Sequence, residues 1–468
     1  MELAVSFIGG EPLYRQLYIH IRSLIQNGVI KDGTKLPSIR SLMQQLSISK
    51  TTVETAYHML LEEGYVRSKE RVGLIVINPT VIKPPDPSSI LNQASDQNFK
   101  ALTGSYEKNY IDFNLLAVDG EIFPIRTWKS IVSEAISLHN QYIHHYGDPR
   151  GEYGLRESLT EYLQKSRGVV CSPDQILIGT GISYSIQLLF RLLEDHNIGI
   201  EKSGIAQVRK IFKQNKFNLI PIAMNDINLL DQELEDSNIR SLYVTPSHRP
   251  SGDPLPYPLR LRVLQWAQQN EGYLIEDDYD GELRLYGKPI PSLQSLDHNG
   301  VVIYIGTFSK VFTPALRMNY MILPIPLLEK LLTLDHMLSP PSRIDQWAME
   351  LFIARGHWYR HLRRIRKVYR YKHQALVQML HRYMPNYVHV EGSKTGLHIE
   401  LSIKSRYDTE QLITLARNNG VLVYGSQDTE VTSTTGTSKV YLGFGGISIQ
   451  EMELGVQLLS RAWSNIAD

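Results

Sequence analysis

The chain has 468 residues, of which 42% are hydrophobic and 21% charged, and its formal net charge of +1 gives no hint of a polyanionic partner. The single cysteine, Cys171, excludes an internal disulfide and a cysteine-based metal site, and no apolar run approaches the roughly 18 residues of a membrane helix. We therefore expect a cytoplasmic globular protein of several domains, without a metal site or a membrane contact.

The first 78 residues predict three helices followed by two short strands. Apolar residues recur at helical spacing from Leu13 to Gly28, and Ser38 is typical of a residue that begins a helix. A third helix is expected from Lys50 to about Glu63. The strands and the charged turn between them are Tyr65 to Ser68, Lys69-Glu70-Arg71 and Leu74 to Ile77. This order of elements indicates a winged helix-turn-helix over residues 1–78.

A helix-turn-helix places the start of its second helix in the major groove of DNA, while neighbouring cations hold phosphates. The basic and small polar residues at these places are Arg40, Ser49, Lys50, Thr51, Thr52, Thr55, Arg67 and Arg71. The alternative is a solvated helix face with incidental charges, and the count of charges alone does not decide between the two.

The segment LPSIRSLMQQLSISKTTVETAYHMLLEEGYV, Leu36 to Val66, resembles the GntR family of bacterial regulators. The resemblance implies a double-stranded DNA operator that is touched by Arg40 and by Ser49 to Thr52. The wing departs from the family pattern, because Arg71-Val72-Gly73 keeps only the second glycine of a Gly-x-Gly tip.

A linker is expected over residues 79–109, where Pro79, Pro84, Pro85 and Pro87 stand close together without an apolar face. From Tyr110 to the C-terminus, apolar β-like runs alternate with amphipathic helical stretches, which favours a mainly parallel sheet between helices. The β-like runs are QILIGTG, NLIPIAM, SLYVTP, YLIEDD and VVIYIG. From about residue 335, a long helical region and the runs HIELSI and KVYLGF indicate a smaller α+β subdomain.

Four side chains of the segments IEDDYDGELRLYG and IYIGTFSKVFTPALRMNY match the needs of a phosphorylated pyridine aldehyde. The amine of Lys310 would form a Schiff base, and Asp277 would keep the ring nitrogen protonated. The phenol of Tyr279 would meet the ring hydroxyl, and Arg317 the phosphate. Spacing does not fix which carboxylate of the acidic run meets the ring, but Asp277 and Tyr279 share one face of a strand.

The C-terminal region resembles the fold-type I aminotransferases, which depend on pyridoxal 5'-phosphate (PLP). The two modules in this order resemble the MocR subfamily of GntR regulators. Three further segments carry the resemblance, namely YGDPRGEYGLRESLTEYL, QILIGTGISYSIQLL and SLYVTPSHRPSGDPLP. It implies that Tyr146 reaches the cofactor phosphate of a partner subunit. It also implies cofactor contacts by Gly181, Ile182, Ser183, His248, Thr307 and Ser309.

Two departures concern the ligand. Relatives hold a substrate carboxylate with a C-terminal arginine, whereas TSKVYLGFGG offers Lys439 and Tyr441. Arg209 could partly substitute, so both Arg209 and Lys439 are candidate effector contacts. An aromatic residue that stacks on the cofactor in relatives corresponds to Ile205. The resemblance therefore does not imply that the protein turns over substrates by transamination.

The expected function is a PLP-dependent, DNA-binding transcription regulator. Its aminotransferase-like domain would sense an amine, an amino acid or vitamin B6 and change operator binding, and the protein would be a homodimer. The alternatives are a working aminotransferase with a DNA-binding appendage and a regulator that has lost the cofactor. The arginine-rich helical run from Ala354 to His373 is either a second DNA-facing patch or a helix with ion pairs at a boundary.

Overall fold

The computed structural model describes residues 5, 7, 10–78, 110–202, 206–247, 254–287, 290–334, 337–385, 387–391, 395–425 and 437–464. The chain forms two compact units, Met1–Tyr106 and Glu107–Asp468, each of which is described by itself. The expected linker, residues 79–109, lies outside the described residues. In the described part of the chain, no helix is both long and apolar enough to cross a bilayer.

The first unit is a three-helix domain with a small antiparallel ribbon. Its elements are α1 (Leu13–Gln26), α2 (Ile39–Leu46), α3 (Lys50–Glu62), β1 (Val66–Lys69) and β2 (Gly73–Val76). Ser38 and Ser49 cap α2 and α3 by accepting hydrogen bonds from the main-chain N–H groups of Ser41 and Thr52. The strands pair from Val66–Val76 to Lys69–Gly73, and Lys35 adds a bridge to Ile75. This arrangement confirms the winged helix-turn-helix.

A seven-stranded sheet organises the second unit, in the order β4-β10-β9-β8-β7-β5-β6. Strand β10 runs antiparallel to both neighbours, whereas the strands from β9 to β6 are parallel. The strands are β4 (Ile176–Gly179), β5 (Asn197–Glu201), β6 (Asn218–Ile222), β7 (Ser241–Val244), β8 (Tyr273–Asp277), β9 (Val302–Thr307) and β10 (Asn319–Ile322). The mainly parallel α/β fold is thereby confirmed, while β5 and β10 were absent from the predicted runs.

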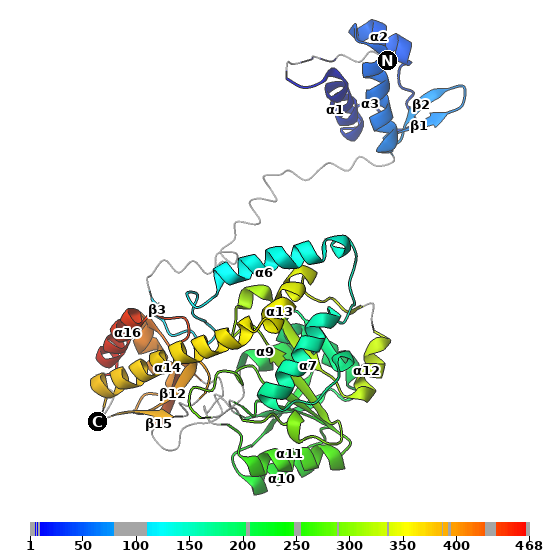
Figure 1. Ribbon diagram of the computed structural model, residues 1–468. Coiled ribbons are helices and arrows are strands. Elements are labelled where there is room, and N and C mark those ends of the chain that lie inside the picture. Colours follow the sequence, from blue (N-terminus) through cyan, green and yellow to red (C-terminus); the bar gives the residue numbers. More distant parts are fainter. Residues whose placement is uncertain are drawn as a thin grey trace. The chain divides into compact units, whose positions relative to one another are not determined.

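Helices cover both faces of this sheet because its strands bury side chains on each side. Ile303 and Ile305 of β9 pack with α8, α9 and α12, whereas Val302 belongs to the cluster under α10 and α11 and Tyr304 to the cluster around α7 and α13. The helices are α6 (Ile125–Leu138), α7 (Tyr153–Arg167), α8 (Ile182–Leu192), α9 (Ala206–Gln214), α10 (Ile227–Asp236), α11 (Tyr257–Gln269), α12 (Ile325–Leu332) and α13 (Arg343–Ala354). Figure 1 shows α6 and α13 side by side along one flank of this layer.

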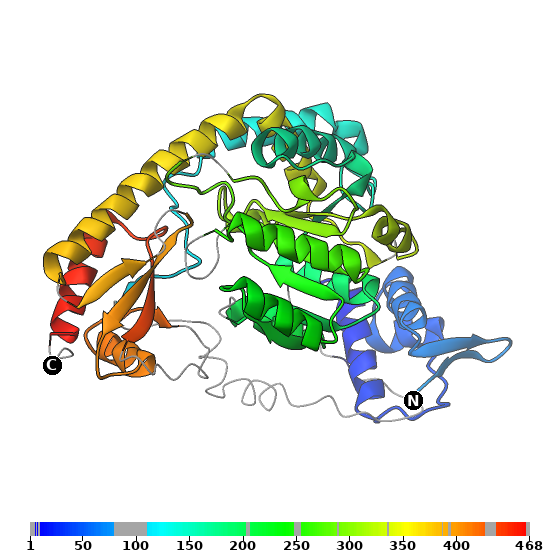
Figure 2. The same ribbon diagram turned by 90° about the horizontal axis from the view of Figure 1, so that it is seen from below.

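A smaller four-stranded sheet follows, in the order β11-β12-β15-β14. The 27-residue helix α14 (His357–Tyr383) runs from the flank of the large sheet to this smaller sheet (Figure 2). The remaining elements are β11 (Val388–Glu391), β12 (His398–Lys404), α15 (Thr409–Asn418), β13 (Val421–Leu422), β14 (Tyr424–Gly425), β15 (Thr437–Gly443) and α16 (Ile449–Ala462). Strand β13 pairs with β3 (Ile111–Asp112), so the first described segment of the second unit packs against this smaller α+β part.

Candidate cofactor and DNA sites

Lys310 lies in the turn that follows β9, and its side chain reaches the start of the second unit. Its Nζ donates a hydrogen bond to the main-chain oxygen of Leu115, at 2.9 Å. Burial lowers the pKa of Lys310 below the ordinary lysine value, and the negative charge of Asp280 opposes this effect. A lowered pKa increases the share of neutral amine, which is the form that attacks an aldehyde carbon.

Asp277 ends β8 and is 7% exposed. The hydroxyl of Tyr243, from the neighbouring strand β7, donates to its Oδ2 at 2.5 Å. Burial raises the pKa of Asp277 to about 7, and the hydrogen bond from Tyr243 partly counters this rise. A cation beside this carboxylate would favour its ionised form. A protonated pyridine ring would be such a cation, and the carboxylate would in turn stabilise the proton on the ring nitrogen.

The two acidic neighbours of Asp277 point to the opposite face of β8, as the alternation of a strand requires. Asp278 accepts hydrogen bonds from Arg167 and from the hydroxyl of Tyr304, at 2.7 and 2.6 Å. Glu276 accepts the main-chain N–H groups of Leu293 and Gln294, at 2.8 and 2.9 Å. Both carboxylates are thus held by structural partners, which supports the choice of Asp277.

Tyr279 follows two residues after Asp277, and burial raises the pKa of its phenol well above the ordinary value. The negative charges of Asp280, Asp277 and Glu201 add to this rise. The phenol therefore stays protonated at neutral pH and can donate a hydrogen bond to an oxygen of a bound ring.

Gly181 and Arg317 form a narrow cradle at the start of α8. Gly181 precedes the helix with φ 123°, and a Cβ at this position would lie only 2.9 Å from Nη2 of Arg317. Asn319 holds the turn, because its Oδ1 accepts the Gly181 N–H at 2.8 Å. Among the described residues, Arg317 has no carboxylate partner and its side chain is exposed. The free N–H groups of a helix start and an unpaired guanidinium together suit a phosphate group.

The other predicted phosphate contacts lie at the same edge of the sheet. Ile182 and Ser183 open α8, and Ser183 is exposed. Thr307 ends β9 opposite Asn319 of β10, and its Oγ1 accepts the Ser309 N–H at 3.1 Å. The structure thus brings Gly181, Thr307 and Arg317 together through the pairing of β4, β10 and β9.

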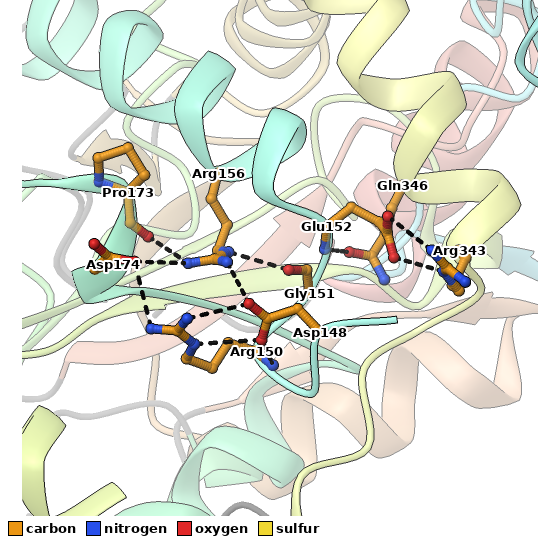
Figure 3. A network of polar contacts seen from close by, with 9 residues as sticks. All are labelled: Asp148, Arg150, Gly151, Glu152, Arg156, Pro173, Asp174, Arg343 and Gln346. Carbon is orange, nitrogen blue, oxygen red and sulfur yellow. Dashed lines mark hydrogen bonds and ion pairs between the residues drawn. The ribbon is translucent and has the colours of Figure 1, made fainter. Parts of the chain in front are cut away.

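Tyr146 lies before α7 and is fully exposed, at 104%. The residues after it are fixed by a polar network, shown in Figure 3. Arg156, 1% exposed, donates to Gly151 O, Pro173 O and Asp148 Oδ2, and Arg343 donates to Glu152 Oε1 at 2.6 Å. Despite partial burial, the hydrogen bonds from Arg150 and the charge of Arg156 lower the pKa of Asp148. The loop is anchored, while the Tyr146 ring is not buried by its own chain.

The predicted effector contacts have partners within the protein. Arg209, on α9, donates through Nη2 to the main-chain oxygens of Glu201 and Lys202. Lys439, on β15, donates to Glu400 Oε1 at 2.5 Å. His248 and Ile205 lie outside the described residues.

The predicted DNA contacts lie on the surface of the first unit. Arg40, Lys50, Thr51, Arg67 and Arg71 are exposed. Ser49 is exposed too, and its hydroxyl caps α3 and lies 2.8 Å from Thr52 Oγ1. Thr52 and Thr55 are half-buried, and Lys50 pairs with Glu54 one turn along the helix, at 3.1 Å. The cations of α2, of the start of α3 and of the wing are therefore accessible to a DNA backbone.

The arginine-rich run begins at the last residue of α13, Ala354, and continues into the first part of α14. Among the described residues, ion pairs hold two of its cations, Arg355 with Glu134 and Lys372 with Asp119. Arg366 and Arg370 instead donate to the main-chain oxygens of Glu282 and Leu285. A cavity of about 430 Å³ lies between α7 and α14, lined by Lys165, Arg363 and Arg366 among others.

Sequence reasoning missed Tyr243, Asn319 and Leu115. Tyr243 stands in an apolar run, and only the pairing of β7 with β8 brings it to Asp277. Asn319 is an amide in the otherwise apolar and aromatic strand β10 and is 1% exposed. Its position in such a run could have indicated a buried side chain with a hydrogen-bonding role. Leu115 acts through its main-chain oxygen, so its side chain carries no signal.

Comparison with known proteins supports the type of domain assigned to each of the two units. Residues 13–76 match the family model of bacterial regulatory proteins, gntR family, and residues 114–426 match aminotransferase class I and II. The HTH-type transcriptional regulator YhdI of Bacillus subtilis is 38% identical over 458 residues, covering 97% of this chain and 96% of its own. The regulatory protein MocR of Rhizobium meliloti is 28% identical over 468 residues, covering 97% and 94%.

A solved structure shows the fold of the second unit. Kynurenine aminotransferase of Pyrococcus horikoshii, in complex with PMP, superposes with a TM-score of 0.70 and 21% identity, covering 81% of this chain and 96% of that one. The fold and the matches define a helix-turn-helix transcription regulator that carries an aminotransferase-type domain. The chain belongs to the MocR type of the GntR family.

Proposed function

We propose that the second unit binds PLP at Lys310 and that an amine effector, or vitamin B6 itself, thereby changes operator binding by the first unit. The observation that carries this proposal is the cradle between Gly181 and Arg317, which any Cβ would fill. Together with Lys310 and Asp277, it matches the amine, carboxylate and guanidinium that a phosphorylated pyridine aldehyde needs.

Each group of the chain would have a separate task. Lys310 Nζ would bind the aldehyde carbon, Asp277 the ring nitrogen and Tyr279 the ring hydroxyl. The start of α8, Arg317, Thr307 and Ser309 would hold the phosphate, with His248 as a further predicted contact. When bound, the cofactor supplies an electron-withdrawing ring and a carbon that captures amines.

Regulation follows if an incoming amine competes with Lys310 for the same carbon. The released amine would return to Leu115 O, which lies between the large sheet and the small α+β part. A coupling of about 1–3 kcal/mol between effector and operator would produce a 5- to 150-fold switch. Two-fold or direct-repeat operator sites would suit a homodimer. Tyr146, which is exposed, would contribute a contact to the partner's cofactor phosphate.

Borohydride treatment of PLP-loaded protein, followed by peptide mass spectrometry, tests the proposal. We expect a pyridoxyl adduct on Lys310 and none in the Lys310→Ala protein. An adduct elsewhere, or no adduct in cofactor-saturated protein, would instead favour a regulator without the cofactor.

A working aminotransferase is the second candidate, because Lys310, Asp277 and Arg317 are all retained. Steady keto-acid formation with two substrates would support it. We expect none, because the segment TSKVYLGFGG offers no arginine for a substrate carboxylate, and its Lys439 is already held by Glu400.

A further inference from the structure

The four-stranded sheet has one apolar and one polar face. Ile399, Leu401 and Ile403 of β12 belong to the main hydrophobic cluster, with Val440 and Leu442 of β15. Since paired residues share a face, the register places Glu400 beside Tyr441 and Ser402 beside Lys439 on the other face. Glu391 of β11 pairs with Glu400 and joins this polar face.

Glu400 lies at the centre of the polar face and is 2% exposed. It accepts hydrogen bonds from the Lys439 ammonium at 2.5 Å and from the Tyr441 hydroxyl at 2.7 Å. Glu391 Oε2 lies 3.9 Å from the same ammonium. Two carboxylates therefore surround one ammonium, and the group formed by Glu391, Glu400 and Lys439 carries a net negative charge.

A short contact path joins this face to Lys310. Gly443 continues the polar face of β15, and a Cβ there would lie 2.1 Å from Asn114 O and 2.9 Å from Leu115 Cα. The main-chain oxygen of that same Leu115 accepts the Lys310 ammonium. Tyr441 and Glu400 form the next residue pair along this face, about 7 Å further.

We infer that the effector captured at Lys310 is a primary amine without a carboxylate, and that Glu400 is the residue that excludes amino acids. This inference rests on the proposed function. A carboxylate that entered this face would meet Glu391 and Glu400. To bind Lys439 it would have to displace Glu400 and leave a buried charge unpaired, which is strongly unfavourable. Exclusion by such a repulsive element is a general route to specificity.

Calorimetric titration of PLP-loaded, full-length protein with matched ligands tests the inference. The pairs are L-alanine with ethylamine and L-lysine with 1,5-diaminopentane, which differ only in the carboxylate. We expect each amine to bind at least about tenfold more tightly than its amino acid. Glu400→Gln keeps the shape and an acceptor for Tyr441 and frees Lys439. It should strengthen amino-acid binding by about tenfold and leave ethylamine unchanged.

Two further variants make the result specific. Glu410→Gln removes an exposed carboxylate from α15 of the same part of the chain and should leave the preference unchanged. Glu391→Gln removes the second carboxylate of this face and keeps the Glu400–Lys439 ion pair, so it should also strengthen amino-acid binding. This variant decides the question if Glu400→Gln does not fold. An unchanged or lower amino-acid affinity in Glu391→Gln would overturn the inference.

The outcomes separate this inference from the proposed function. No pyridoxyl adduct on Lys310 would defeat the proposed function and the inference with it. An adduct on Lys310 together with tighter binding of amino acids than of amines would overturn the inference alone. Equal shifts of both ligand types in Glu400→Gln would show a purely structural ion pair and would also overturn it.

Discussion

The hydroxyl of Tyr243 lies 2.5 Å from Oδ2 of Asp277, across the pairing of β7 with β8. On the opposite face of β8, the hydroxyl of Tyr304 makes an equivalent contact with Asp278, at 2.6 Å. Two adjacent carboxylates at the end of β8 thus each have their own tyrosine, and the proposed function assigns only Asp277 to the cofactor.

Tyr243→Phe should weaken PLP binding by about tenfold, because Asp277 loses a hydrogen bond that stabilises its charge. The ring contact with Phe212 remains, so the fold should be kept. Fluorescence titration with PLP measures the effect. Tyr304→Phe is the matched control, and it should lower stability without a change in PLP affinity. Equal losses of affinity in both variants would contradict the assignment of Asp277.

Gly181→Ala should weaken PLP binding at least as much as Arg317→Gln. The new methyl group would crowd the Arg317 guanidinium and force an unfavourable backbone conformation at φ 123°. Equilibrium dialysis against PLP provides the measurement. Arg191→Gln, at the far end of α8, controls for a general loss of charge and should bind normally. Normal binding by both site variants would remove the phosphate cradle from the proposal.

The contribution of Asp277 to the stability of the cofactor-free protein should fall as pH rises from about 4 to 7. Asp277 holds its proton up to a pKa of about 7 when folded, against an ordinary value of 3.8. The folded state thus binds more protons in this range, and the stability present at low pH is lost as pH rises. Asp277→Asn should recover at most about 4 kcal/mol of unfolding free energy at pH 8.

Urea denaturation followed by tryptophan fluorescence can measure the unfolding free energy of the second unit at each pH, because all 5 tryptophans lie in this unit. The comparison of Asp277→Asn with the original protein at pH 5 and pH 8 isolates the effect. Burial likewise raises the pKa of Glu276 and Glu282 to about 7, so part of the pH dependence should remain in the variant. A variant that is equally destabilised at both pH values would show that the titration of Asp277 is not responsible.

Operator binding should weaken in Arg40→Ala and Lys50→Ala, since both exposed cations lie where phosphates and base edges are expected. For each lost phosphate contact, the slope of log affinity against log salt should become shallower by about 1. Binding to the chain's own upstream DNA at several salt concentrations measures this slope. Arg15→Ala, an exposed cation on α1, is the control and should change neither quantity. Unchanged slopes in all three variants would exclude this recognition surface.

The first unit and the order of its elements could be predicted from the sequence because the signals are local. Apolar spacing, the caps Ser38 and Ser49, and the turn between the strands of the wing lie within a few residues of the elements they define. The strands β5 and β10 were missed, since short buried segments such as Asn319–Ile322 lack a periodic pattern.

The sequence by itself determined which reactive side chains the second unit offers to a cofactor. Asp277, Tyr279, Lys310 and Arg317 could be identified because they stand in short motifs near the ends of apolar strands. The tertiary structure alone decided which groups meet. Tyr243 reaches Asp277 across 34 residues, and Glu400 reaches Lys439 across 39. The physical reason is that strand pairing and register, not neighbourhood in the chain, bring these side chains together. Burial then sets the pKa of Asp277 and Lys310, and burial exists only in the folded protein.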